Sequence, residues 1–439
     1  MATMKRTNNW APLLILSGFL LVRVSVSTIE VAAATSRTSP SNNECRSNSN
    51  AIAPPEQTTS ASDRFGSNTS STAIAVLEDI LADDYERLDP TVLTNSVAVL
   101  KERGAHRCWH KHSTFLEHLL GVHNILRLWQ QGATIGRVGL FHSAYSNSYV
   151  NLALFDPARE RDSMKALIGE PAEDLVHLFC IIDRQQVVVN TLLKQGFIPE
   201  AGLSVPHLRD SSQQVYLSPE TLRMLAVFTM ADIADQYFGW QDELFGGGGT
   251  SGSMIIPGQD SEARHDATAI WPGPSKPGLW MSYVSQLAAV ARTFSPEWRS
   301  TPTEEQVVDV PPVFASGTAT LSVEDESTAR DLYWSVVMGQ VSDSDHAIDT
   351  LQRCIDKNPW AFEPKVMLAQ KMIHRNDFDG ALEAARQALN LQHQWGTAWD
   401  KRLSFAAWVA WTRVLLQRAE DRQPWPDNSW DVNNLGLVR

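Results

Sequence analysis

The 439-residue chain has few cysteines and no run of basic residues. Its four cysteines lie far apart and form no Cys-x-x-Cys pair, which argues against a zinc knuckle or a disulfide-held scaffold; they are Cys45, Cys108, Cys180 and Cys354. Cys180 stands in an apolar, helix-forming stretch, so we expect it in the core. The formal net charge is −13, and the chain lacks the basic surface that binds nucleic-acid phosphates. We therefore expect no nucleic-acid partner.

The motifs of several large enzyme classes are also missing. There is no nucleophile elbow and no dinucleotide fingerprint, and the four glycines at 246–249 are not followed by the Lys-Ser/Thr of a phosphate-binding loop. We therefore expect no nucleotide cofactor and interpret the glycine run as the start of a flexible insertion, 246–278. Strand-like alternation of apolar and polar residues is scarce as well, which leaves helices as the main element.

The first 34 residues have the layout of a signal sequence. Lys5 and Arg6 precede an apolar run at 10–22, and small residues follow through Ala34. The run is shorter than the roughly 20 residues that a membrane span needs, and it fits a signal peptide. We predict a signal peptide or signal anchor at 1–34 that directs the chain to the secretory pathway or to an organelle. An uncleaved signal would anchor the chain in a membrane, and we expect membrane contact through this segment only.

Residues 35–72 have the composition of a disordered tether. Serine, threonine and asparagine supply 21 of these 38 residues. Such a segment has too little apolar surface to offset the entropy of ordering it. Asn68-Thr-Ser is a glycosylation sequon that would be used only if the chain enters the secretory route. We therefore place the start of the folded part at residue 73.

From residue 73 onward the apolar residues recur at intervals of three and four, which predicts an all-α fold. A first helical domain is expected at 73–294, with Ser113 as the N-cap of the helix that contains His118 and with Pro171 and Pro219 in first helical turns. Its clearest helices are predicted at 114–130, 135–144, 159–168, 172–185, 219–238 and 279–294. An irregular stretch at 295–327, which contains Pro311-Pro312, is interpreted as a linker.

A second helical domain, 328–439, has the spacing of a tetratricopeptide repeat. Ala347 and Ala381 are 34 positions apart, and small residues at such sites let two helices of a hairpin approach closely. One good repeat is predicted at 363–392 and one degenerate repeat before it. Two repeats bury too little surface to be stable alone, so we expect this domain to dock on the first domain or to bind a protein partner. Six tryptophans crowd its last 45 residues, and we expect them to close the end of the helical core; they are Trp395, Trp399, Trp408, Trp411, Trp425 and Trp430.

Two histidines are the best candidates for chemistry. His118 and His142 lie 24 positions apart, and each stands in an apolar, helix-forming run. Two such imidazoles can point from neighbouring helices into one interior and bind a divalent metal. Ligands of one ion must then place their nitrogens within about 3–4 Å of each other. The competing interpretation is a pair of hydrogen-bonded core histidines. His123 falls on another face of its helix, so we do not expect it to be a ligand.

The patterns Phe115-Leu-Glu-His-Leu-Leu-Gly-Val-His-Asn-Ile-Leu and Gly139-Leu-Phe-His resemble the first half of the HD metal-dependent phosphohydrolase superfamily, most of all the (p)ppGpp hydrolase domain. The superfamily also contains diiron oxygenases. Residues 112–184 are further similar to an HD-like family of unknown function from bacteria and photosynthetic eukaryotes. In the latter, tetratricopeptide-like helices follow, with a Trp-rich end similar to Trp395-Gly-Thr-Ala-Trp-Asp-Lys-Arg. This resemblance would extend over 75–439 without the insertion.

The resemblance implies a metal site and also shows a departure from it. Met230-Ala-Asp-Ile-Ala-Asp-Gln is similar to the helix that supplies a distal aspartate, so the implied ligands are His118, His142 and Asp232, with Asp235 as the second choice. The expected ion is Mn, Fe or Zn. Where the superfamily has His-Asp, this chain has His142-Ser143, and a serine hydroxyl is a poor ligand for a hard divalent ion. Further candidates for ligands or for polar residues lining the site are His112, Ser143, Tyr145, Asp183 and Arg184.

Two functional hypotheses follow from these residues. The first is a metal-dependent enzyme that activates water against a phosphate ester or anhydride, or that uses oxygen as the oxygenase branch does. The second is a non-catalytic interaction protein in which the HD-like helices are a scaffold and the repeats bind a partner. The retained histidine pair favours the enzyme, and the change to Ser143 favours the scaffold.

Overall fold

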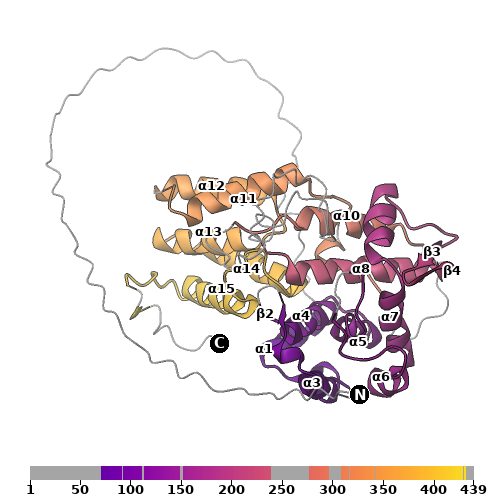
Figure 1. Ribbon diagram of the computed structural model, residues 1–439. Coiled ribbons are helices and arrows are strands. Elements are labelled where there is room, and N and C mark those ends of the chain that lie inside the picture. The colour runs from indigo at the N-terminus through magenta and orange to yellow at the C-terminus, as the bar shows by residue number, and fades with distance from the viewer. Residues whose placement is uncertain are drawn as a thin grey trace, which may run out of the picture. The chain divides into compact units, whose positions relative to one another are not determined.

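The computed structural model describes residues 71–90, 92–110, 113–148, 152–238, 276–295, 308–315, 317–341, 343–428, 430 and 431 (Figure 1). The predicted leader, all but the end of the predicted tether, most of the 246–278 insertion and His112 lie outside the described residues. The described chain is mostly helical, as predicted, with two short β-hairpins. None of its helices is both long and apolar enough to cross a membrane.

The N-terminal helices lead into the element that carries His118. They are α1 (Ser71–Leu81), α2 (Tyr85–Leu88), α3 (Leu93–Glu102) and the 3-10 turn η2 (Ala105–Arg107), followed by the strands β1 (Trp109–His110) and β2 (Ser113–Thr114). Helix α4 (Phe115–Leu128) begins with a capping box, in which the Thr114 hydroxyl accepts from the Glu117 amide and the Glu117 carboxylate accepts from the Thr114 amide. The N-cap is therefore Thr114, and the prediction of Ser113 was wrong by one residue.

Helix α5 (Ala133–Phe141) lies very close to α4 because two glycines face it. A Cβ atom on Gly139 would come within 3.2 Å of the His123 backbone, and one on Gly136 would come within 2.7 Å of the Arg127 side chain. His123 is buried at this contact, and its Nδ1 lies 3.0 Å from the Asn124 side chain. It contributes to packing, in agreement with its exclusion as a ligand.

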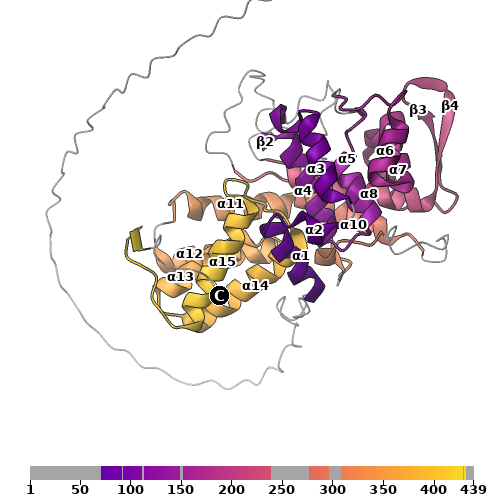
Figure 2. The same ribbon diagram turned by 90° about the horizontal axis from the view of Figure 1, so that it is seen from below.

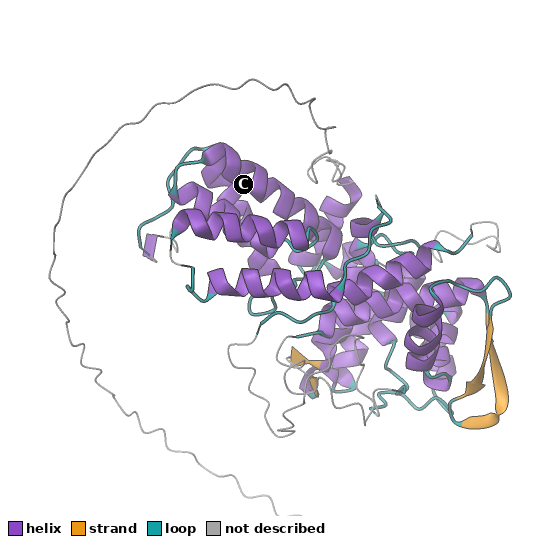
Figure 3. Ribbon diagram, turned by 90° about the horizontal axis from the view of Figure 1, so that it is seen from above, coloured by secondary structure: helices purple, strands orange, loops and turns teal. Residues whose placement is uncertain are grey.

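Helices α6 (Arg161–Ile168) and α7 (Glu170–Ile181) precede η3 (Gln186–Leu193), a π-helical segment. Cys180 is buried, as expected. The strands β3 (Leu203–His207) and β4 (Asp210–Leu217) then pair antiparallel, with Leu203 opposite Leu217 and an irregularity between Pro206 and His207 (Figure 3). The helix-based prediction missed this hairpin, although apolar residues recur at every second position in both strands, as Leu203 and Val205 and as Val215 and Leu217.

Helix α8 (Pro219–Gln236) is the central element of the first half of the chain. Ser218 caps it by accepting from the Thr221 amide, and Pro219 occupies the first turn as predicted. The helix has apolar residues on all sides, and every residue from Leu222 to Ala234 is buried. It contacts α4, α5, η3 and the later helix α10 (Met281–Arg292). This burial places the charged groups of that stretch, Arg223 and Asp232, in a low-dielectric interior.

The C-terminal half is a stack of helices side by side (Figures 1 and 2). After the short turn η6 (Pro312–Phe314) they are α11 (Val323–Val337), α12 (Ser344–Lys357), α13 (Glu363–His374), α14 (Phe378–Trp395) and α15 (Phe405–Glu420). The two alanines that define the 34-residue spacing, Ala347 and Ala381, are fully buried between packed helices, as that spacing predicts.

One cluster of buried apolar side chains extends from α2 to α15, so both halves of the chain share a core. The tryptophans at the C-terminal end contribute strongly. Trp395 and Trp399 are fully buried and Trp408 nearly so, as expected, whereas Trp430 is 77 % exposed and does not belong to the core. The Trp395 ring lies edge-on to Trp280 at the start of α10, which joins the two halves directly.

Candidate metal centre

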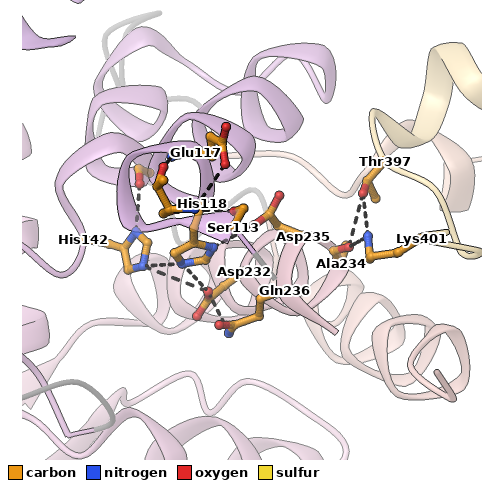
Figure 4. A network of polar contacts seen from close by, with 12 residues as sticks. Ser113, Glu117, His118, His142, Asp232, Ala234, Asp235, Gln236, Thr397 and Lys401 are labelled. Carbon is orange, nitrogen blue, oxygen red and sulfur yellow. Dashed lines mark hydrogen bonds and ion pairs between the residues drawn. The ribbon is translucent and has the colours of Figure 1, made fainter. Parts of the chain in front are cut away.

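Three potential ligand atoms converge from α4, the end of α5 and α8 (Figure 4). His118 Nε2 lies 3.3 Å from His142 Nε2 and 3.5 Å from Asp232 Oδ1, and the His142–Asp232 distance is 4.0 Å. All three side chains are at most 3 % exposed. The predicted approach of the two imidazoles is therefore confirmed, and Asp232 rather than Asp235 completes the group.

Asp235 orients the His118 ring instead of joining the group. Its Oδ2 lies 2.7 Å from His118 Nδ1. An ionised carboxylate only accepts hydrogen bonds, so the Nδ1 atom of His118 carries the proton. In the neutral tautomer the Nε2 lone pair then points toward His142. This carboxylate–histidine pair is the usual arrangement behind a metal-binding histidine.

A backbone carbonyl orients the His142 ring in the same way. His142 is the C-cap of α5, and its Nδ1 lies 2.8 Å from the carbonyl oxygen of Gly139. A carbonyl also only accepts, so Nδ1 donates and Nε2 keeps its lone pair. Burial lowers the pKa of His142 to about 3, although the Asp232 carboxylate opposes the shift. His142 is thus a neutral imidazole at physiological pH.

Two imidazole nitrogens and a carboxylate oxygen therefore face one another in the protein interior. All three can act as metal ligands, and a cation between them would offset the cost of burying the carboxylate. Metal–nitrogen bonds of about 2.0–2.1 Å place neighbouring ligands of a tetrahedral ion about 3.4 Å apart. The observed separations of 3.3 and 3.5 Å match this spacing, and the His142–Asp232 separation of 4.0 Å is wider than it. The residues present can therefore hold a divalent metal.

Asp232 is held in place and kept ionised by its neighbours. Arg184 Nη2 donates to Asp232 Oδ2 at 2.5 Å, and Gln236 Nε2 donates to Oδ1 at 2.9 Å. Burial alone would raise the pKa of Asp232, but the Arg184 guanidinium and the two histidines outweigh it and keep this pKa well below its usual range. The Asp232 carboxylate is consequently an anion at physiological pH.

Arg184 brings a positive charge to the edge of the site. Its guanidinium lies over the rings of Phe179 and Phe228, at 5.7 and 5.0 Å from their centroids. Arg184 lies two residues before the π-helical segment η3, a backbone geometry often found at functional sites. The prediction that Arg184 lies at the site is thus supported by its bond to Asp232.

The other candidates from the sequence form contacts of their own. The Ser143 hydroxyl accepts from Asn147 at 2.8 Å. The Tyr145 hydroxyl donates to Glu173, which also accepts two bonds from Arg161, so Tyr145 belongs to a separate buried network. The Asp183 carboxylate accepts from the Gln186 amide at 3.1 Å.

Two residues that the sequence reasoning missed shape the site. Gln236 was not considered, although it follows the two aspartates directly in the motif. Gly121 lies on α4 where the Asp235 side chain passes, and a Cβ atom there would be 2.1 Å from Asp235 Oδ1. A glycine three residues after His118 could have indicated a close approach of another element on the same helix face.

The comparisons with known proteins concern the same segment. Residues 99–184 match the family model of a domain of unknown function, DUF6817. No curated protein and no solved structure matched the chain. The matched segment contains His118, His142 and Arg184, whereas Asp232 lies beyond it. The likeness to the HD superfamily therefore stays a resemblance in sequence pattern.

Proposed function

We propose that this protein is a mononuclear metal-dependent hydrolase of phosphate esters or anhydrides, with His118, His142 and Asp232 as the ligands. The observation that carries the proposal is the buried group of three potential ligand atoms, in which the two Nε2 atoms lie 3.3 Å apart and each Nδ1 is bound to an acceptor on its other side.

A divalent ion bound here supplies Lewis acidity toward a phosphoryl oxygen and lowers the pKa of a coordinated water. The chain's own residues set the charge around the reaction. Asp235 holds the His118 ring, and the cation of Arg184 at Asp232 Oδ2 favours an anionic substrate over a neutral one. With Ser143 in place of the second carboxylate, the chain offers ligands for one ion rather than two.

A second candidate is an iron-dependent oxygenase. Two histidines and one carboxylate are also the ligand set of mononuclear non-haem iron oxygenases, and they leave positions open for other ligands. The identity of the bound metal separates the two candidates. Zinc or manganese with phosphatase activity supports the hydrolase, whereas ferrous iron with oxygen uptake supports the oxygenase.

The test is the metal content of the purified full-length chain and of two histidine variants, measured by plasma mass spectrometry after incubation with Zn²⁺, Mn²⁺ or Fe²⁺ and desalting. We expect about one equivalent in the wild type, less than a tenth of an equivalent in His142→Asn, and wild-type content in His123→Gln. His123 is the matched control because it is an equally buried histidine on the same helix as His118.

Hydrolysis of bis(p-nitrophenyl) phosphate by the loaded wild type and His142→Asn then tests the reaction class. The wild type should be active and His142→Asn inactive. A wild-type chain with less than a tenth of an equivalent of any of the three metals would contradict the proposal. It would leave the second hypothesis, a helical scaffold whose repeats bind a protein partner.

A further inference from the structure

The turn at 395–401, between α14 and α15, contacts the end of the helix that carries His118. The Trp129 indole at the C-cap of α4 donates to the Trp395 carbonyl at 3.1 Å. Gly396 has φ +71°, and a Cβ atom there would lie 3.0 Å from the Leu128 side chain and 3.4 Å from the Ile125 backbone. Only glycine adopts this backbone conformation without strain and lets the turn approach α4 so closely.

The same turn caps the helix that carries Asp232. Lys401 Nζ donates to the Ala234 carbonyl at 2.6 Å, and the Thr397 hydroxyl donates to the same oxygen at 3.3 Å. Ala234 lies among the last four residues of α8, whose carbonyls have no partner within the helix. An ammonium group at a helix C-terminus also interacts favourably with the helix dipole. Lys401 and Thr397 therefore hold the last turn of α8 closed.

That end of α8 contains three side chains of the site. Residues 232–236 include Asp232, the Asp235 that orients His118, and the Gln236 that donates to Asp232. Figure 4 shows Lys401, Thr397 and the Ala234 carbonyl beside this group. Fraying of the last turn would displace both carboxylates together. The positions of these side chains on α8 thus depend on residues more than 160 positions later in the chain.

The turn is itself rigidly held, so it can act as a fixed support. The Glu363 carboxylate at the start of α13 accepts from the backbone amides of Trp399 and Asp400 at 2.6 and 3.0 Å. The Trp399 indole donates to the Gly278 carbonyl at 2.9 Å. These bonds join the turn to the repeat helices on one side and to the start of α10 on the other.

We infer that the 395–401 turn is an internal clamp for the metal centre, in which Lys401 and Thr397 are positioning residues that fix α8 relative to α4. This inference rests on the proposed metal site. It gives the C-terminal helices a role in the chemistry of the N-terminal half, without any contact between their side chains and the metal or substrate.

The experiment compares the full-length wild type with Lys401→Met, Lys401→Arg, Thr397→Val and a control, Lys365→Met. Lys365 is also buried, on α13, where its ammonium donates to Gln387. Hydrogen exchange followed by mass spectrometry, without metal, reports the opening of α8 at residues 229–238. Calorimetric titration with Zn²⁺ reports the affinity of the site, and thermal unfolding shows that each variant is folded.

We expect Lys401→Met to speed exchange at 229–238 and to weaken Zn²⁺ binding roughly 10-fold or more, the range seen when groups behind a metal ligand are removed. Lys401→Arg should restore most of the affinity, Thr397→Val should lose less than Lys401→Met, and Lys365→Met should match the wild type in both measurements. If Lys401→Met fails to fold, the same two measurements on Thr397→Val still test the clamp.

Unchanged exchange at 229–238 in both Lys401→Met and Thr397→Val would overturn the clamp, whatever the metal does. Zn²⁺ affinity equal to that of the wild type in both variants would overturn it as well. A wild type that binds no Zn²⁺ would contradict the proposed metal site instead, and the exchange measurement would still decide whether the turn holds α8.

Discussion

Gly121 shows how a residue without a side chain can determine the geometry of the site. Asp235 reaches His118 Nδ1 by passing over the Gly121 position, where a Cβ atom would be 2.1 Å from one carboxylate oxygen and 2.8 Å from the carboxylate carbon. An added methyl group at position 121 would push against this carboxylate, whose other oxygen is bound to His118. The glycine on α4 and the carboxylate on α8 therefore form one functional unit.

The variant Gly121→Ala should lower metal affinity about 10- to 100-fold, because the His118 ring loses the carboxylate that orients it. Alanine is the better helix former by about 1 kcal/mol, so α4 itself should persist. Titration with Zn²⁺ measures the effect, and Gly317→Ala is the control because nothing lies within 4 Å of a Cβ atom there. Equal affinities in Gly121→Ala and the wild type would refute the role given to Asp235.

At the scale of elements, α8 explains which part of the site could be predicted. The resemblance of the motif around Met230 identified the helix and favoured Asp232 over Asp235, but α8 is apolar on all sides and its periodicity alone offers no polar face that separates the two. The choice of Asp232 over Asp235 depends on partners from other elements, namely Arg184 and His118. Such pairings between distant segments are not visible in local periodicity.

Helix α13 begins with a buried carboxyl group that makes stability depend on pH. Burial raises the pKa of Glu363 from 4.5 to about 7, although the amides of Trp399 and Asp400 oppose the shift. Because the pKa is higher in the folded state, the protonated Glu363 side chain stabilises the fold. This stabilisation is fully present below about pH 4.5 and is lost as pH rises toward 7. The shift corresponds to about 3 kcal/mol.

In Glu363→Gln the side-chain oxygen can still accept from both amides, but the group no longer ionises. We expect the unfolding free energy of the wild type to fall relative to that of Glu363→Gln as pH rises. The relative loss should reach up to about 3 kcal/mol between pH 4.5 and 7.5. Urea unfolding of both chains across this range measures it. Parallel pH profiles for the two chains would show that Glu363 is already ionised in the folded protein.

At the scale of the whole molecule, the helices were predicted, and docking of the second domain on the first was one of two expectations, but the residues that make the contact were not predicted. The 34-residue spacing predicted the packed alanines of α12 and α14, because small residues at a helix contact leave a local signal. That Gly396 and Lys401 would contact α4 and α8 has no such signal, since these contacts join segments more than 160 residues apart. The β3–β4 hairpin was missed because its alternation covers few residues.

The shared core also explains how the C-terminal helices are stabilised. Two repeats bury too little surface to be stable alone, and here the cluster of buried residues continues from them into the N-terminal half. Trp395 contributes its ring to this core and its carbonyl to α4. A docked, rigid C-terminal half is what the clamp on α8 requires.

Anomalous diffraction from crystals of the full-length chain soaked in Zn²⁺ tests the central claim most directly. The account predicts one strong peak about 2.0–2.2 Å from His118 Nε2, His142 Nε2 and Asp232 Oδ1, and its loss in His142→Asn. The two imidazoles should keep their Nδ1 bonds to Asp235 and to the Gly139 carbonyl. A map without a peak between these three atoms, from crystals that bind Zn²⁺ elsewhere, would contradict the metal centre.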